Sequence, residues 1–178
     1  MAKTIETGKT KQKDWNRVVY TTVYDEVIGK TIESYEKGQF NDNNDGDDYL
    51  LFKFTDGTSL LFYHEQDCCE FVFIDDICGD LDDLVGSPLV TCECVQNFDN
   101  VREAEYDDYW TWTFYHFATE KGRVDVKWYG TSNGYYSEKV DSCYTDENGD
   151  EHIIGDYRER YTLHEIKEKL NMEEIDND

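Results

Sequence analysis

The 178-residue sequence predicts a mainly β fold of the α+β class, with antiparallel sheets, hairpins, a meander and two short helices. Two observations support this prediction. Aromatic residues make up 15% of the chain, and their side chains suit the half-buried face of a sheet. Several stretches also alternate apolar and polar residues and are separated by glycine-containing turns. A chain of this length suits one domain with a core and is short for two ordinary domains.

The domain is expected to span residues 17–171, after a loose, polar and lysine-rich arm over residues 1–16. Strand-like segments follow at 18–24 and 27–35. The polar loop 41–48 places acidic and amide side chains at several positions of a calcium loop. However, phenylalanine stands where the bidentate glutamate is needed, and no helices flank the loop, so a calcium site is not expected.

A hairpin is the clearest local prediction. Residues 49–54 and 59–64 are aromatic and aliphatic runs joined by a turn that contains Asp56-Gly57. This pair favours a two-residue type I′ turn, because both central residues need positive φ. That turn would place Phe52 opposite Leu61 and Tyr49 opposite His64.

A three-stranded meander is predicted further along the chain. Its strands are residues 110–116, 124–128 and 135–144, with glycine-containing turns between them. In the first strand, Trp110, Trp112 and Phe114 alternate and therefore share one face. This segment is interpreted as sheet core together with a partner-binding face.

The two helices are predicted from apolar spacing and capping signals. Residues 79–85 carry Leu81, Leu84 and Val85 at helical spacing, and acidic residues in the first turn favour a helix start there. Residues 162–171 begin with a capping box and continue with an apolar stripe. The acidic tail 172–178 is expected to be frayed.

Charge restricts the classes of partner. The chain has 41 acidic and 17 basic residues, so its formal net charge is −24. Such a protein repels phosphate backbones and anionic membrane surfaces, so direct nucleic-acid or membrane binding is not expected. Basic proteins and metal cations are electrostatically favoured partners. No signal core or membrane-spanning run is seen, which indicates a cytoplasmic protein whose six cysteines stay reduced.

No catalytic residue and no cofactor is expected. The weak candidates for a metal site are His64, Cys68, Cys69, Cys78, Cys92 and Cys94. Their C-C and C-x-C spacings differ from the C-x₂₋₄-C pattern of zinc knuckles, and free cysteines often pack as small core residues. The carboxylates around Cys68 and Cys69 also oppose a reactive thiolate there. No glycine-rich phosphate loop is present.

The distribution of acidic residues is more informative. No lysine or arginine occurs between Lys53 and Arg102, whereas eleven acidic residues do. Such a face can be merely solvated, or it can dock into a basic groove by imitating a nucleic-acid backbone. The residues expected to form this partner-binding acidic face are Glu65, Asp67, Glu70, Asp75, Asp76, Asp80, Asp82 and Asp83.

Five short motifs stand out along the chain: 63–70 (YHEQDCCE), 77–88 (ICGDLDDLVGSP), 112–115 (WTFY), 128–130 (WYG) and 133–138 (NGYYSE). Together they resemble the motifs of a family of small phage- and prophage-encoded proteins of unknown function. The similarity runs from about residue 27 to residue 143, and Phe71 departs from it because a small polar residue is expected there.

The resemblance implies no activity, but it implies a phage protein made in the cytoplasm of a bacterial host cell. The favoured hypothesis is therefore an acidic viral protein that inhibits or modulates a host factor, in an anti-defence or anti-CRISPR role. Its partner would be a host protein with a basic surface, such as a nuclease or a nucleic-acid-binding complex. Two alternatives stay open: a metal-stabilised domain or metal-dependent enzyme using His64 and cysteines, and a virion or assembly component.

Overall fold

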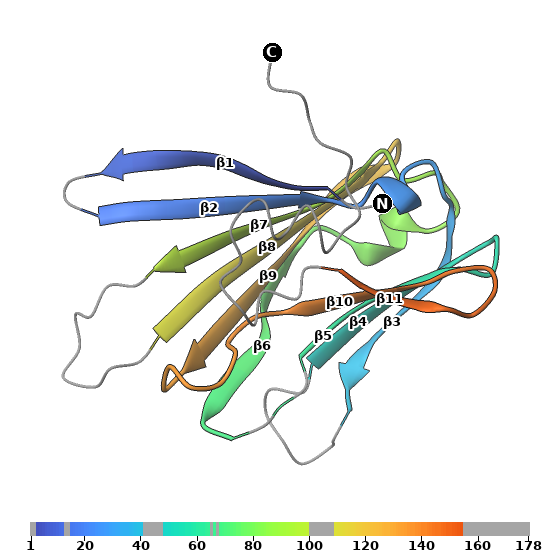
Figure 1. Cartoon of the computed structure of the whole chain (residues 1–178). Helices are drawn as coiled ribbons and strands as arrows, with labels where there is room; N and C mark the ends of the chain where they lie inside the picture. Colours follow the sequence, from blue (N-terminus) through green and yellow to red (C-terminus); the bar gives the residue numbers. More distant parts are fainter. Residues whose placement is uncertain are drawn as a thin grey trace.

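The computed structural model describes residues 3–12, 15–40, 48–64, 66, 68–99 and 109–154. In this part of the chain, eleven strands form two antiparallel sheets, and two single-turn 3₁₀ helices are the only helical elements. The two sheets lie as separate layers (Figure 1). The prediction of a mainly β, antiparallel fold is thus confirmed. None of the described helices is long and apolar enough to cross a membrane.

The larger sheet has six strands in the order β1-β2-β7-β8-β9-β6. The strands β1 and β2 pair as a hairpin at one edge, so the residues expected to be a loose arm include a strand. The bounds are β1 Lys3–Gln12, β2 Trp15–Val23, β6 Glu70–Cys78, β7 Thr91–Asp99, β8 Tyr109–Thr119 and β9 Gly122–Ser132.

The smaller sheet has five strands in the order β11-β10-β5-β4-β3. The bounds are β3 Ile32–Gln39, β4 Asp48–Phe54, β5 Ser59–Tyr63, β10 Asp141–Thr145 and β11 Glu151–Ile154. A hydrogen bond links the two sheets, because the Ile74 N–H of β6, an edge strand of the larger sheet, donates to the Asp48 side-chain carboxylate of β4 at 2.7 Å.

The core lies between the two sheets and is rich in aromatic side chains. Phe52 of β4 contacts Phe117 of β8 edge-to-face, with ring centroids 4.9 Å apart. Phe62 of β5 lies 4.4 Å from the ring of Tyr115. All four side chains are buried. An edge-to-face pair such as Phe52 and Phe117 adds stability beyond the area that it buries. The aromatic content that predicted the fold is therefore also what joins its layers.

The hairpin forms where it was predicted, but its register differs by one residue. Phe52 pairs with Leu60 rather than Leu61, and Tyr49 pairs with Tyr63 rather than His64. The cause is a three-residue loop, closed by hydrogen bonds from Gly57 N–H to Phe54 O and from Phe54 N–H to Thr58 O. Gly57 at φ +85° supplies the left-handed residue that such a loop requires.

The carboxylate of Asp56 fixes this turn. It accepts hydrogen bonds from the Thr58 N–H and hydroxyl, and it pairs with Lys30. Burial alone would raise the pKa of Asp56, but the hydrogen bonds from Lys30 and Thr58 outweigh it and lower the pKa from 3.8 to about 2. Because the pKa is lower in the folded than in the unfolded state, the ionised Asp56 carboxylate stabilises the fold at pH values above the unfolded-state pKa. This stabilisation is lost as the pH falls from 3.8 to about 2.

We therefore expect the replacement Lys30→Met to raise the pKa of Asp56 toward 3.8. Carbon-13 NMR titration of the side-chain carboxyl groups measures this value directly. The control variant is Lys53→Met, which removes the exposed ion pair with Glu36 and leaves Lys30 in place. An unchanged Asp56 pKa in the Lys30 variant would show that the lysine does not hold the turn.

Of the three strands of the predicted meander, only the first two pair with each other, as a hairpin. Strands β8 and β9 pair as expected, but the other neighbour of β9 is β6, and residues 141–145 form β10 in the smaller sheet. The chain leaves β9 and crosses between the layers directly over Gly130. A Cβ atom at Gly130 would lie 1.9 Å from the backbone oxygen of Glu138. Only glycine allows this close approach.

The predicted helix at 79–85 is a single 3₁₀ turn, η2, at Leu81–Leu84. Gly79 at φ +106° and Gly86 at φ +81° bound it on either side, which limits it to one turn. The other turn, η1 at Asp25–Val27, lies between the two predicted strand segments and overlaps the second only at Val27. The loop 41–47, the predicted helix 162–171 and the tail 172–178 lie outside the described residues.

Candidate functional site

Four exposed aspartates lie where β6 ends and η2 begins. They are Asp76, Asp80, Asp82 and Asp83, and we call them the acidic patch. Asp80 caps the 3₁₀ turn, because its Oδ1 accepts a hydrogen bond from the Asp82 N–H at 2.9 Å. Aspartate is favoured at this capping position because its carboxylate accepts a hydrogen bond from a backbone N–H of the first turn. The sequence therefore fixes the backbone that presents the patch.

A tyrosine from the smaller sheet completes the surroundings of the patch. The Tyr35 hydroxyl of β3 donates a hydrogen bond to Asp82 Oδ1 at 2.9 Å. This bond is the largest cause of the raised pKa of Tyr35, and burial and the charges of Asp82 and Asp80 add to it. The hydroxyl thus stays protonated and acts as a donor beside the carboxylates.

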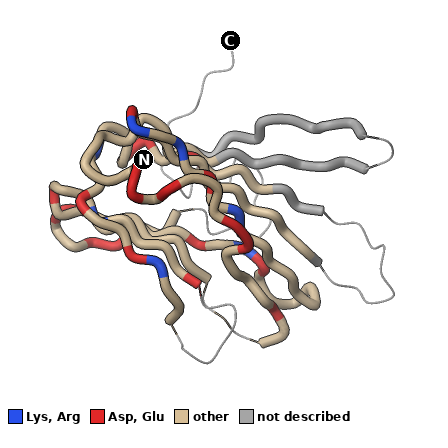
Figure 2. The backbone as a smooth tube through the Cα atoms, turned by 180° about the vertical axis from the view of Figure 1, so that it is seen from behind, with Lys and Arg blue, Asp and Glu red and all other residues tan. Residues whose placement is uncertain are grey.

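The charge of the acidic patch is not neutralised within the described part of the chain. None of its four carboxylates forms a salt bridge there. Lys121 donates instead to the backbone oxygen of Val85 at 2.8 Å. Acidic positions outnumber basic ones over the described backbone (Figure 2). Exposed like charges without a cation are available to a basic partner.

The other four residues of the predicted acidic face lie elsewhere. Glu70 is buried at the opposite end of β6, so its inclusion in an exposed face was wrong. Asp75 is exposed, but its carboxylate forms an ion pair with Lys127 at 3.1 Å. Glu65 and Asp67 lie outside the described residues. Of the six predicted residues that the structure describes, the acidic patch contains four, with Asp75 next to it in sequence.

An aromatic row runs across the outer face of the larger sheet. It consists of Phe71 and Phe73 of β6, Tyr129 of β9 and Trp112 of β8, with successive ring centroids 5.0, 5.9 and 4.4 Å apart. These side chains are half-buried, while alternate residues such as Trp128 point into the core. The row is therefore turned away from the smaller sheet.

Lys127 connects the aromatic row with the acidic end of β6. Its ammonium lies 4.0 Å from the centroid of the Trp112 ring and also pairs with Asp75. A cation above the face of an indole is attracted by the ring's electron density. On this outer face, aromatic side chains thus lie next to carboxylates. Protein interfaces commonly combine an aromatic centre with a charged rim in this way.

The metal candidates are dispersed. Among the described residues, no group of three or more His, Cys, Asp or Glu side chains could hold a metal ion. Cys92 and Cys94 are buried on β7, and burial raises the pKa of both thiols. Cys78 is exposed at the end of β6, and Cys68 and Cys69 are exposed just before its start. The two ring nitrogens of His64 face the Lys139 backbone oxygen and the Glu70 carboxyl group.

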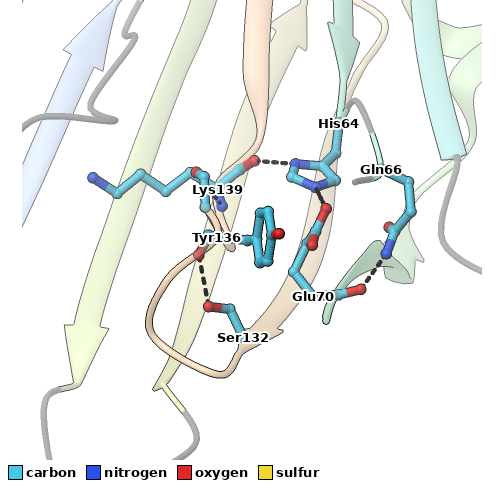
Figure 3. A network of polar contacts seen from close by, with 7 residues as sticks. His64, Gln66, Glu70, Ser132, Tyr136 and Lys139 are labelled. Atoms are coloured by element: carbon cyan, nitrogen blue, oxygen red, sulfur yellow. Dashed lines mark hydrogen bonds and ion pairs between the residues drawn. The ribbon is translucent and has the colours of Figure 1, made fainter. Parts of the chain in front are cut away.

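A buried polar network joins the two segments that cross between the sheets (Figure 3). One segment, 64–70, leads from β5 to β6, and the other, 133–140, leads from β9 to β10. His64 Nδ1 lies 2.8 Å from the Lys139 backbone oxygen, and its Nε2 lies 3.4 Å from Glu70 Oε1. Because a carbonyl oxygen only accepts, Nδ1 carries a proton, and Nε2 faces the Glu70 carboxyl group as the second polar partner of the ring.

Loss of this pairing should destabilise the fold. Glu70→Ala leaves the buried Nε2 of His64 facing the space that the carboxyl group filled, and we expect a loss of about 2–4 kcal/mol in unfolding free energy. Glu70→Gln keeps a polar group near Nε2 and should lose less. Urea denaturation measures both variants, and equal stabilities of wild type and Glu70→Ala would contradict a structural role for the pair.

Comparison with known proteins gives one match. Residues 25–142, well over half of the chain, match the family described as a domain of unknown function (DUF7448). This span contains the acidic patch, the aromatic row and the buried network. No curated protein and no solved structure matches the chain.

Proposed function

The chain belongs to the family described as a domain of unknown function (DUF7448), and we propose that it is a non-catalytic binding protein. In this proposal it docks its acidic patch into a basic, nucleic-acid-binding site of a partner protein. The observation that carries the proposal is the group of four exposed aspartates, none with a salt-bridge partner in the described chain.

Electrostatics supports this kind of partner. At a net charge of −24 the whole molecule attracts a basic surface over long distances and speeds the encounter. A site that binds nucleic acid holds lysines and arginines spaced to receive phosphates. Carboxylates held on a capped turn can take the place of those phosphates. On binding they lose less conformational freedom than the carboxylates of a disordered acidic tail would lose.

The aromatic row supplies what charge alone lacks. Tight protein interfaces depend on a few large side chains, most often Trp, Tyr and Arg, in a region that excludes water. The tilted rings of Trp112 and Tyr129 are in contact on the outer face, with centroids 4.4 Å apart, and Lys127 links them to Asp75 beside the acidic patch. In the proposed complex the aromatic row gives affinity, whereas the acidic patch gives orientation and rapid association.

The similarity to small phage-encoded proteins suggests which cell supplies the partner. We propose a bacterial host factor, in the cytoplasm, that cuts or binds nucleic acid, so that occupation of its basic site would counter host defence. An acidic inhibitor of this kind needs no catalytic group of its own. It competes with nucleic acid for the same cations.

An affinity pull-down from bacterial lysate at low and moderate salt tests the proposal, with bound proteins identified by mass spectrometry. We expect a basic nuclease or nucleic-acid-binding protein that is released as salt rises, because screening weakens contacts between exposed charges. A short DNA duplex added as competitor should release the same protein. A partner that resists both salt and DNA would contradict docking at a nucleic-acid site, as would the absence of any specific partner.

A further inference from the structure

Two adjacent thiols lie at the end of the crossing segment 64–70. Cys68 and Cys69 are both exposed, and their sulfur atoms are 2.8 Å apart. A disulfide bond is about 2.05 Å long. The sulfurs therefore need to approach by less than about 1 Å to form one.

The backbone around the pair is held in place from several sides. Cys69 has φ +68°, and it is the one non-glycine residue with positive φ in the described chain. Its carbonyl oxygen accepts a hydrogen bond from the Asn133 N–H at 3.2 Å, and the next residue, Glu70, pairs with Ser132. Gln66 also donates to the backbone oxygen of Glu70. A conformation that cysteine rarely adopts persists only where its surroundings impose it.

The other cysteines are poorly placed to compete. Cys92, Cys94 and Cys143 are buried. Cys78 is exposed, but it stands at the far end of β6 from Cys69, about 30 Å along an extended strand. Reaction between Cys68 and Cys69 is thus favoured over any other pairing within the chain.

We propose that Cys68 and Cys69 are a modification site, where a hydroperoxide forms a reversible vicinal disulfide. One sulfur attacks an oxygen of the peroxide as its thiolate and breaks the O–O bond, a step that the carboxylates of this segment slow because they disfavour the thiolate. This gives a sulfenic acid, and the leaving oxygen takes up the thiol proton and departs as an alcohol, or as water when the oxidant is hydrogen peroxide. The neighbouring thiol then displaces the sulfenic oxygen as water and the S–S bond forms. In total, two thiols lose two hydrogens, and one hydroperoxide is reduced.

The Cys68–Cys69 disulfide should also be easier to reduce than an ordinary disulfide bond. Neighbouring Cα atoms are about 3.8 Å apart across a trans peptide, closer than the roughly 4.4–6.8 Å of ordinary disulfides. Strained and exposed disulfides have higher reduction potentials and are the labile ones. A dithiol reductant should therefore restore both thiols.

Digestion with a glutamate-specific protease isolates the site, because cleavage after Glu65 and Glu70 releases residues 66–70 with both cysteines and no other. After treatment of the full chain with hydrogen peroxide and an alkylating reagent, we expect this peptide to lack two hydrogens and to carry no alkyl group. Dithiothreitol should reverse the change. Sulfinic acid at one cysteine, or a disulfide-linked dimer through this peptide, would overturn the proposal.

A glutathione titration tests whether the fold prepares the pair. The folded protein should reach half oxidation at a ratio of oxidised to reduced glutathione at least tenfold lower than the protein in urea. Equal ratios would overturn the proposal. The variant Cys78→Ser, at the exposed cysteine that ends β6, should behave as wild type, and Cys68→Ser should form no intramolecular disulfide at this site.

Discussion

Replacing Gly130 with alanine is expected to destabilise the protein by about 3 kcal/mol or more, or to prevent folding. The new Cβ would meet the Glu138 backbone oxygen at 1.9 Å and its carbonyl carbon at 2.9 Å. Overpacking a core costs about 1–3 kcal/mol when side chains can move aside. Here the obstacle is backbone, and the crossing segment that contains it is held to the other sheet through Lys139 and His64.

Urea denaturation of Gly130→Ala measures this effect. The matched control is Gly38→Ala, also in a strand, where the atoms nearest to the Cβ would belong to the end of the Tyr49 side chain, at 3.1 Å and beyond. We expect the control to stay within about 1 kcal/mol of wild type, because that side chain can shift. Comparable stabilities of the two variants would show that the crossing segment does not pass over Gly130 as described.

Reversing the charge of the acidic patch is expected to weaken binding of the captured partner about a hundredfold, or roughly 2.8 kcal/mol. The variant Asp76→Lys, Asp82→Lys, Asp83→Lys replaces three carboxylates with ammonium groups. Asp80 is kept because its side chain caps η2. Titration calorimetry of wild type and variant with the purified partner measures the difference.

A matched triple variant separates the acidic patch from net charge. Glu147, Asp150 and Glu151 are exposed acidic residues at the turn between β10 and β11. Changing these three to lysine alters the total charge by the same amount. We expect at most a few-fold loss of affinity. Equal losses in both triples would mean that the patch has no special part in recognition and that only overall charge attracts the partner.

Local patterns in the sequence predict elements better than they predict neighbours. Alternating aromatic residues locate β8, β9 and the β4–β5 hairpin correctly. The register of that hairpin depends on whether the loop has two or three residues, and Asp56-Gly57 is compatible with both. The pairing of β9 with β6 joins residues from 47 positions apart (Cys78 and Asp125) to 62 positions apart (Glu70 and Ser132), and no pattern within either strand specifies it.

The candidate site could be predicted only in part. Charge alone predicted an exposed acidic face that includes Asp80, Asp82 and Asp83, but it could not separate these residues from Glu70. That carboxyl group is buried because His64 lies opposite, a tertiary contact without a local signal. The aromatic row was missed on β6, although the alternation of Phe71 and Phe73 around buried Val72 is a signal that could have located it.

Amide hydrogen exchange of the chain with and without its partner tests the central claim most directly. If the acidic patch docks into a basic site, exchange should slow in the end of β6 and in η2, within residues 76–84, and on the aromatic row. The β10–β11 turn, which carries the control acids, should exchange as in the unbound protein. Protection confined to that turn or to the segment 64–70, with residues 76–84 unchanged, would contradict the proposed mode of binding.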